Sequence, residues 1–401
     1  MNVLFLTISK IDSINSHGIY KDLMRKFRDE GHQVFIVTPV ERKTGQKTVL
    51  IKIDGVSILK VKTLNLKKTN VFEKGIGTLM LEHQFLHAIN KKFSHHVFDL
   101  LLYSTPPITV TKIVKKIKKR DGAMTYLMLK DIFPQNAVDL EMIKVNSLLH
   151  KYFRSKEEAL YSTSDYIGCM SPANVSYLMK HNPQIDPQIV EVNPNSIEPS
   201  KIKKDDGLRK TIRAKFNLPE GKTIFIYGGN LGKAQGIDFL LETINVCSKV
   251  DTAFFVIVGN GTEYLNIQHW FSEKKPKNAM LIKGLSKQDY DDLLKACDVG
   301  LIFLDRHFTI PNYPSRLLAY LENSMPIIAA TDPHTDIGAI AVENGYGLCA
   351  LSGDVALMKE YITSLACNNA LIKKMGKKGY QFLLQNYTVE QSYSKIMAHF
   401  S

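Results

Sequence analysis

Cysteine is scarce in this chain of 401 residues, which has five, and no two of them are close in sequence. An odd number of cysteines, without close pairs or metal-ligand spacing, argues against a disulfide framework and against a cysteine metal site. We therefore expect reduced and mostly buried thiols. The five positions are Cys169, Cys247, Cys297, Cys349 and Cys367.

Long apolar runs are also absent, since none reaches the ~18 to 20 residues that a membrane-spanning helix needs. Residues 1–7 have neither a basic lead nor a cleavage site, which predicts a strand rather than a signal peptide. Apolar residues make up 44% of the chain and charged residues 23%, as in a soluble globular protein. The chain is too long for one ordinary core and suits two α/β domains. These features predict a cytoplasmic protein.

The formal net charge is +13 and is unevenly distributed. Residues 1–200 contain 28 Lys and Arg against 19 Asp and Glu, an excess of nine, which leaves an excess of four for the remainder. A basic first half suggests an anionic partner: a membrane surface, a phosphorylated lipid or a nucleic acid. An ordinary solvated lysine surface is the alternative.

Both halves of the chain alternate short apolar runs with helix-like segments, the pattern of parallel β-α units. A charged stretch at residues 201–206, following a proline-rich strand end, is the best linker. We predict a Rossmann-like domain over 1–200, a second over 201–385, and a C-terminal helix over 386–401 that crosses back towards the first domain. The expected fold class is α/β, with two Rossmann-like domains facing across a cleft.

Two loops of the first half follow predicted strands and carry reactive side chains. One loop ends in His17, directly before Gly18 and the start of a predicted helix. The other begins with Lys130 and Asp131, immediately after the strand at 126–129. Because the carboxyl ends of parallel strands meet at one edge of a sheet, both loops are candidate walls of an active cleft. A cap or turn aspartate is the alternative interpretation of Asp131.

In the second half, glycine-rich loops follow three consecutive predicted strands. Such loops let backbone amides approach a diphosphate. The first loop, 228–236, has neither the spacing of a nicotinamide site nor the Gly-Lys-Ser/Thr of a P-loop, so the combination predicts another kind of nucleotide-diphosphate site. The residues singled out in these loops are Gly229, Asn230, Lys233, Gly259, Gly284 and Leu285.

A short helix is predicted at the same edge of the second sheet. Pro314 disfavours helical dihedrals at Tyr313, and Ser315 can cap a helix that begins there. The apolar runs at 299–304 and 326–330 read as buried parallel strands on either side. Free amides at the start of the helix would bind phosphate.

Residues 70–93 show apolar residues at helical spacing. One interpretation is a helix of the core. Because lysines flank it, a helix lying on a membrane surface is the other. These lysines are Lys67, Lys68, Lys74, Lys91 and Lys92.

Taken together, these segments resemble a GT-B glycosyltransferase of the large retaining family 4 over essentially the whole chain. The matching segments are the Gly18 loop, Asn195, and residues 228–236, 257–261, 313–317 and 325–329. Within that family the chain is most similar to bacterial transferases that add N-acetyl-L-fucosamine in capsule and O-antigen synthesis. That similarity is carried by residues 131–134, 312–322 and 335–338.

The chain departs from this family where the nucleotide sugar is usually held. Two glutamates are usual before the proline that opens the next strand, and Pro311 and Ala319 stand there instead. Glu322, one helical turn beyond Ala319, is a candidate replacement for the ribose ligand. A solvent-facing helix residue is the alternative for Glu322.

The usual Arg and Lys clamp on the diphosphate is also replaced, by Asn230 and Gln235. Lys233 and Arg316 would then have to offset the diphosphate charge, and the Arg316 fork suits phosphate. The resemblance therefore implies a donor site that binds a UDP-sugar. Its predicted members are Gly18, Gly229, Asn230, Lys233, Gly259, Gly284, Leu285, Tyr313, Ser315, Arg316, Leu317 and Glu322.

The implied function is transfer of an N-acetyl-fucosamine-type sugar from UDP to a polyprenyl-diphosphate-linked saccharide. We expect Asp131 to orient or deprotonate the acceptor hydroxyl, with His17 and Lys130 beside it. The enzyme would work without cofactor or metal, since no Asp-x-Asp stands where a GT-A enzyme would need one. It would sit peripherally on the inner face of the bacterial membrane, in contact with anionic lipid and without a nucleic-acid partner.

Two other functions are consistent with parts of the sequence. A non-hydrolysing UDP-sugar epimerase has the same fold, but it would need neither a lipid acceptor nor a basic first domain. A basic nucleic-acid-binding protein is suggested by charge alone, and the chain has no recognition motif for one.

Overall fold

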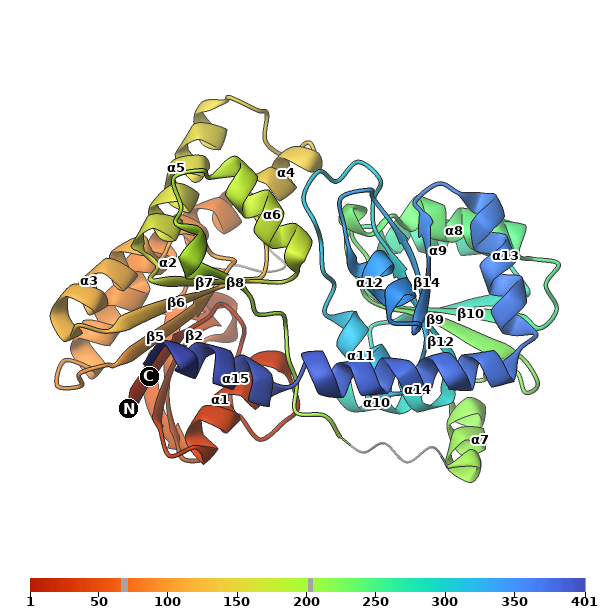
Figure 1. Cartoon of the computed structure of the whole chain (residues 1–401), viewed down its shortest axis with the longest axis horizontal. Helices are drawn as coiled ribbons and strands as arrows, with labels where there is room; N and C mark the ends of the chain where they lie inside the picture. The colour runs from red at the N-terminus through yellow and green to blue at the C-terminus, as the bar shows by residue number, and fades with distance from the viewer. Residues whose placement is uncertain (66–70, 201–204, 401) are drawn as a thin grey trace. The chain divides into compact units, whose positions relative to one another are not determined.

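The computed structural model describes residues 1–65, 71–200 and 205–400. The chain divides into two compact units, drawn in Figure 1. Unit 1 comprises Met1–Glu198 and Thr388–Ser401, and unit 2 comprises Pro199–Tyr387. Residues 201–204 of the predicted linker lie outside the described residues, and Asp205 caps the first helix of unit 2 by accepting a hydrogen bond from the Leu208 amide at 2.7 Å.

Unit 1 contains an eight-stranded sheet with strand order β3-β4-β2-β1-β5-β6-β7-β8. All neighbours are parallel except β3 and β4. Its strands are β1 (Asn2–Leu6), β2 (Gln33–Glu41), β3 (Val49–Ile53), β4 (Val56–Thr63), β5 (Leu100–Ser104), β6 (Met124–Leu129), β7 (Tyr166–Cys169) and β8 (Val190–Val192). Its helices are α1 (Ile19–Asp29), α2 (Val71–Lys92), α3 (Thr111–Asp121), α4 (Gln135–Asp139), α5 (Leu148–Thr163), α6 (Pro172–His181) and α15 (Val389–Met397).

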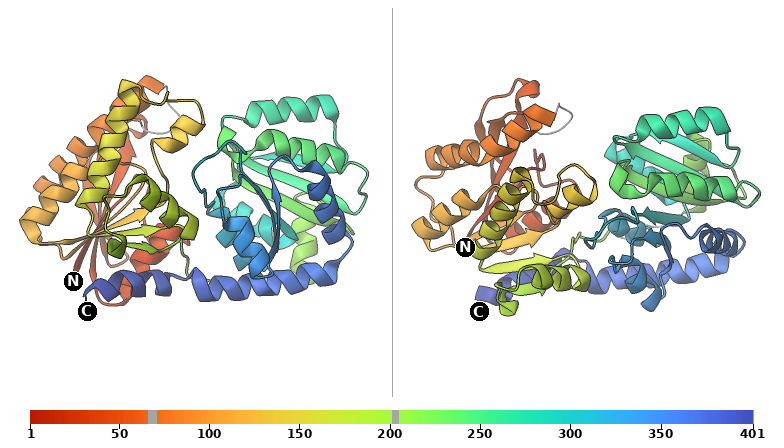
Figure 2. Two further views of the ribbon diagram at one scale, coloured as in Figure 1. Left: turned by 45° about the horizontal axis from the view of Figure 1, so that its top comes forward. Right: turned by 90° about the horizontal axis from the view of Figure 1, so that it is seen from above.

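Helices cover both faces of this sheet, because its central strands are apolar on both sides. Alternate residues of β1, Val3 and Phe5, join the core formed with α1 and α15, while Leu4 is equally buried on the other face. The last helix, α15, contributes Val389 and Ile396 to that core. Just before it, Ile197 and Thr388 form a parallel bridge that joins the two segments of unit 1. Figure 2 shows α1 and α15 side by side.

Unit 2 contains a fully parallel six-stranded sheet with strand order β11-β10-β9-β12-β13-β14. Its strands are β9 (Thr223–Asn230), β10 (Ala253–Asn260), β11 (Ala279–Lys283), β12 (Val299–Phe303), β13 (Ile327–Thr331) and β14 (Gly347–Leu351). Its helices are α7 (Asp206–Lys215), α8 (Ile237–Val246), α9 (Tyr264–Lys274), α10 (Lys287–Ala296), α11 (Arg316–Glu322), α12 (Ile337–Glu343), α13 (Val355–Ala366) and α14 (Asn369–Asn386). The carboxyl ends of β9 to β12 therefore share one edge.

Most predicted strands are present, and one local prediction about a helix is wrong. Ser315 does not cap α11 with its side chain, because its own dihedrals are helical (φ −63°, ψ −16°) and a capping residue is normally extended.

All five cysteines are free thiols, and three of them are buried. No helix within the described residues is both long enough and apolar enough to cross a membrane.

The predicted helix at 70–93 is present as α2, and each interpretation fits one part of it. Phe85 and Ile89 are buried, as expected of a core helix. Ile76, Leu79 and Met80, nearer its start, are exposed. Two of the flanking lysines, Lys67 and Lys68, lie outside the described residues.

Asp298 fastens α7 to the sheet of unit 2. Its carboxylate accepts hydrogen bonds from Arg209 Nη2 at 2.5 Å, Arg213 Nη2 at 2.9 Å and the Ile224 amide at 2.8 Å. Asp298 is buried, so removing it would leave the buried guanidinium of Arg213 without its carboxylate partner. We expect Asp298→Ala to lower the free energy of unfolding by about 3 kcal/mol, measured by urea denaturation. Asp291→Ala, which breaks an exposed pair with Lys287, should leave it nearly unchanged.

Candidate functional site

Three glycines lie next to one another at the carboxyl ends of β9, β10 and β11. Gly229 pairs with Gly259, and the Gly284 amide donates to the Gly259 carbonyl at 3.1 Å. A side chain on Gly259 would come within 1.9 Å of the Gly229 oxygen, and Gly229 itself has a φ of 125°. Only glycine fits such backbone, which leaves this edge of the sheet bare and open to the approach of a ligand.

The guanidinium of Arg316 lies beside this bare edge. Its Nη2 donates to Gln235 Oε1 at 2.6 Å, and its central carbon stacks 4.2 Å from the centre of the Tyr227 ring. Its Nη2 would be 3.6 Å from a side chain built on Gly229. Its Nη1 is buried and has no hydrogen-bond partner among the residues that the structure describes. A buried guanidinium nitrogen without an acceptor is costly unless a ligand supplies one, and an anionic oxygen is the natural choice.

Tyrosines fix the surroundings of Arg316. Tyr227 donates to Gln235 Oε1 at 3.2 Å, so one amide oxygen holds both the guanidinium and the phenol. Tyr320, one helical turn beyond Arg316, accepts from the Gly228 amide at 3.1 Å and ties α11 to β9. Burial tends to lower the pKa of Arg316, but the nearby tyrosines outweigh burial and raise it, so the positive charge is secure.

The other predicted site residues of the second half differ in how exposed they are to solvent. Asn230, Lys233 and Ser315 are exposed, Leu285 is half-buried and Leu317 is buried. The Tyr313 hydroxyl is hydrogen-bonded to that of Tyr387. Gly229, Gly259 and Gly284 are neighbours at the bare edge of the sheet, here called the glycine edge, and Gly229 lies beside Arg316. That these residues form one donor site stays a prediction.

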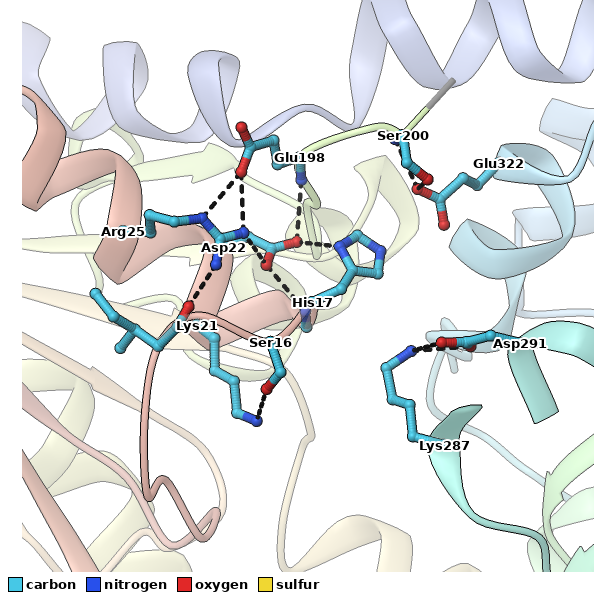
Figure 3. Close-up of polar contacts among 12 residues, drawn as sticks. Ser16, His17, Lys21, Asp22, Arg25, Glu198, Ser200, Lys287, Asp291 and Glu322 are labelled. Carbon is cyan, nitrogen blue, oxygen red and sulfur yellow. Dashed lines mark hydrogen bonds and ion pairs between the residues drawn. The ribbon is translucent and has the colours of Figure 1, made fainter. Parts of the chain in front are cut away.

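Glu322 is not a solvent-facing residue, and that alternative is wrong. Its side chain is buried, and its Oε1 accepts from both the amide and the hydroxyl of Ser200, at 2.9 and 2.8 Å, as Figure 3 shows. In this structure Glu322 therefore holds the start of unit 2 in place. Its predicted role as a ribose ligand stays a prediction.

In unit 1, a buried carboxylate organises the loop that ends at Gly18 (Figure 3). Asp22 Oδ2 lies 2.8 Å from His17 Nδ1, and Oδ1 accepts from the Gly18 amide at 2.9 Å and from Arg25 at 2.7 Å. Oδ2 also accepts from the Glu198 amide at 3.1 Å. Burial alone would raise the pKa of Asp22, but these donors, His17 first, outweigh burial and lower it. Asp22 thus fixes the ring of His17.

Lys130 and Asp131 lie together at the end of β6. One hydroxyl, Thr105 Oγ1, accepts from both of their amides, at 3.0 and 3.1 Å. Burial lowers the pKa of Lys130 to about 7, and its Nζ donates to the Asn193 carbonyl at 3.0 Å. Burial raises the pKa of Asp131 to about 6, partly opposed by the Asn136 amide that donates to it at 2.8 Å. Both groups can therefore change protonation near neutral pH.

A cavity of about 170 Å³ lies next to this strand end. Ile132 and Pro134, just after Asp131, form part of its wall. Helix α5 contributes His150 and Arg154, and α6 contributes Tyr177. The cavity and the Lys130–Asp131 pair are thus parts of one region of unit 1.

Several of these residues were not identified from the sequence. Asp22 reads as an ordinary acidic residue in the first turn of a helix, and Tyr227 as a core aromatic of a strand. Gln235 was noted only as a departure from the family. The one signal for Tyr320 is its spacing of four from Arg316, which places both on one side of α11.

Residues 209–382 match the family Glycosyl transferases group 1. The chain is a glycosyltransferase. The matched residues all lie in unit 2, and the enzyme class predicted from the sequence is confirmed.

Two curated relatives agree with this assignment. The chain is 24% identical to the probable glycosyltransferase WbjE of Pseudomonas aeruginosa over 336 residues, 82% of this chain and 81% of WbjE. It is 22% identical over 249 residues, 60% of each chain, to WcaI of Escherichia coli K12, a putative colanic acid biosynthesis glycosyl transferase.

The fold is similar to that of solved structures. WaaG, a glycosyltransferase involved in lipopolysaccharide biosynthesis, superposes with a TM-score of 0.66 at 12% identity, covering 99% of this chain and 99% of WaaG. The structure of HepE from Anabaena in complex with UDP and glucose superposes with a TM-score of 0.72 at 13% identity, covering 100% of this chain and 99% of HepE. The predicted fold class, α/β with two Rossmann-like units of the GT-B type, is confirmed.

No cluster of three or more His, Cys, Asp or Glu within the part of the chain that the structure describes could hold a metal ion. The expectation that the glycosyltransferase works without metal stays a prediction.

The geometry of Arg316 leads to a prediction about donor binding. We expect Arg316→Ala to weaken UDP binding about tenfold to a hundredfold, because charge-assisted hydrogen bonds to a diphosphate would be lost. Arg316→Lys should recover only part of this, since lysine has no fork. Isothermal titration with UDP gives the dissociation constants.

The control is Lys249→Ala, which removes a charge before β10, at the opposite edge of the sheet, and should bind UDP normally. Wild-type affinity in Arg316→Ala would show that Arg316 does not hold the donor.

Proposed function

We propose that this glycosyltransferase moves an N-acetyl-fucosamine-type sugar from UDP to a polyprenyl-diphosphate-linked saccharide, with retention of configuration. Unit 2 binds the donor and unit 1 binds the acceptor. The reaction takes place at the inner face of the bacterial membrane, during assembly of a capsule or O-antigen. The observation that carries the donor half of the proposal is the buried, unpartnered Nη1 of Arg316 beside the bare backbone at Gly229.

Two of the relatives support the finer parts of this proposal. WcaI bears a name from colanic acid biosynthesis, which favours a surface polysaccharide as the product. HepE binds UDP on the same fold, which favours a uridine nucleotide as the donor. The choice of N-acetyl-fucosamine rests on the resemblance of residues 131–134, 312–322 and 335–338 to transferases of that sugar.

In the proposed reaction, Arg316 and backbone amides of the glycine edge stabilise the charge that develops on the leaving diphosphate. Lys233, exposed at the loop after β9, adds a second positive charge. Donor contacts by Asn230, Leu285, Tyr313, Ser315 and Leu317 remain part of the proposal. Retention requires the acceptor hydroxyl to attack from the face of the sugar that the diphosphate leaves. Holding the leaving diphosphate on that face is therefore compatible with a retained product.

On the acceptor side, Asp131 orients the attacking hydroxyl and takes its proton. Its raised pKa suits a base that must be ionised near neutral pH and still accept a proton. His17, fixed by Asp22, and Lys130 are placed beside the acceptor in this proposal.

The proposed function is tested with a panel of UDP- and GDP-sugars and a polyprenyl-diphosphate-linked saccharide isolated from cells. We expect sugar transfer from UDP-N-acetyl-fucosamine and none from the GDP-sugars. Mass spectrometry of the lipid product identifies the sugar, and the anomeric proton coupling in NMR reports retention. Transfer from a GDP-sugar alone, or an inverted product, would contradict the proposal.

The pKa of Asp131 gives a prediction about pH. A base must be deprotonated, so kcat/KM of the wild type should fall as pH drops through about 6, where Asp131 takes up its proton. Asp131→Asn should lower kcat about a hundredfold or more and abolish this acid limb.

The matched control for that variant is Asp139→Asn, an acidic residue on the same side of unit 1 that follows β6 by ten positions and lies at the end of α4. It should keep the wild-type pH profile. An unchanged acid limb in Asp131→Asn would assign the titration to another group.

A further inference from the structure

Large apolar side chains are exposed together in one segment of unit 1, residues 142–152. They are Met142, Val145, Leu148, Leu149 and Tyr152. Leu148 is 88% exposed, more than any other large apolar residue within the described part of the chain. Exposed apolar side chains scattered singly need no explanation, but a cluster of this kind marks a binding surface.

The fold itself presents these side chains. The segment joins α4 to α5 and turns at Glu141 and Asn146, which both have left-handed backbone (φ 59° and 61°). Ile143, between the exposed Met142 and Val145, is buried and anchors the turn.

The second part of the segment is equally well ordered. The Ser147 hydroxyl caps α5 by accepting from the His150 amide at 3.2 Å. Leu148 and Leu149 then form the first turn of the helix. Their exposure is therefore a property of a folded turn and a capped helix.

Positive charge surrounds the apolar side chains. There is no Asp or Glu from Met142 to Lys156. Lys144 and Lys151 are exposed, and Lys156 Nζ lies 5.4 Å from the centre of the Tyr152 ring. Arg154 is paired with Glu157 and Glu158 and adds no net charge to this surface.

We propose that residues 142–156 form a docking surface for an anionic lipid bilayer, with the five apolar side chains inserted at the level of the headgroups. Lysines next to exposed leucines suit anionic lipid, whose surface attracts each of them. The centre of a protein interface, in contrast, is depleted in lysine. This inference rests on the proposed function, because a polyprenyl-linked acceptor would be held in that bilayer.

The position of the surface suits such an acceptor. Helix α5 carries Leu148, Leu149 and Tyr152, and the same helix lines the 170 Å³ cavity with His150 and Arg154. The wall of the cavity also contains Ile132, which follows Asp131. Docking through α5 would therefore place the cavity and the proposed acceptor residue next to the lipid headgroups.

The test is flotation of the full chain with vesicles of phosphatidylcholine, with or without phosphatidylglycerol. We expect the wild type to float with the vesicles that contain phosphatidylglycerol. Leu148→Glu/Leu149→Glu should reduce that bound fraction about tenfold. Lys144→Ala/Lys151→Ala should also reduce it and should make the remaining binding less sensitive to salt, because the electrostatic attraction is what salt screens.

The matched control is Leu265→Glu, on α9 of unit 2, where the leucine is 72% exposed and alone. It should bind like the wild type. Circular dichroism melting of each variant establishes that it is folded.

Three outcomes would overturn the proposal. The Leu148/Leu149 variant could bind anionic vesicles as well as the wild type does. Binding could instead be lost only in Leu79→Glu/Met80→Glu, which would assign it to α2. Sedimentation could show a dimer of the wild type that the Leu148/Leu149 variant cannot form, with vesicle binding unaffected, which would assign the surface to a second copy.

Transfer to a short-chain acceptor in solution separates this proposal from the proposed function. If the surface only docks the enzyme, the Leu148/Leu149 variant should keep wild-type transfer to that acceptor and lose it on vesicles. If neither the wild type nor the variants transfer sugar, but vesicle binding changes in the variants as expected, the proposed function fails and the docking surface stands.

Discussion

The contacts of the half-buried Arg316 guanidinium with Gln235 and Tyr227 are the interaction around which the glycine edge of unit 2 is arranged. A positive charge partly removed from water is stabilised by acceptors and by aromatic faces, and here Gln235 and Tyr227 supply them. Tyr320 then ties the helix of Arg316 to β9 through the Gly228 amide, and Gly300 has no side chain that would strike the Tyr320 ring. Nη1 has no hydrogen-bond partner among the described residues, and this is why we propose that it binds an anionic oxygen of the donor.

This arrangement accounts for part of the departure from the usual family pattern. A lysine at position 235 would bring a second positive charge against Arg316, whereas Gln235 presents its oxygen to it. The glutamine at position 235, in place of the usual lysine, therefore suits the position of the Arg316 guanidinium beside it. No acid stands at Pro311 or Ala319, and the nearby Glu322 uses its Oε1 to accept hydrogen bonds from Ser200.

The sequence predicts the architecture well because parallel strands buried on both faces leave unmistakable apolar runs, such as 299–303 and 327–331. Glycine positions were equally informative. Gly259 is needed because a side chain there would strike the Gly229 oxygen, and Gly229 because its φ is positive. What the sequence could not supply were contacts between distant residues. Gln235 Oε1 accepts hydrogen bonds from both Tyr227 and Arg316, and the Asp22 carboxylate contacts the His17 ring. Both contacts depend on side-chain packing that the spacing of residues in the sequence does not encode. Ser315 failed as a cap because its dihedrals, set by the tertiary fold, overrode its local preference.

The segment that closes the chain also limits how the protein can be divided. Helix α15 belongs to unit 1, although the chain reaches it only after completing unit 2. Its Tyr393 packs edge-on against Phe27 of α1, with ring centres 4.9 Å apart, and accompanies Val389 and Ile396 in that core. A single cut near residue 200 would therefore give an N-terminal fragment with an uncovered apolar face, which should aggregate. Unit 2 is continuous in sequence, so one contiguous fragment, Pro199–Tyr387, contains all of it.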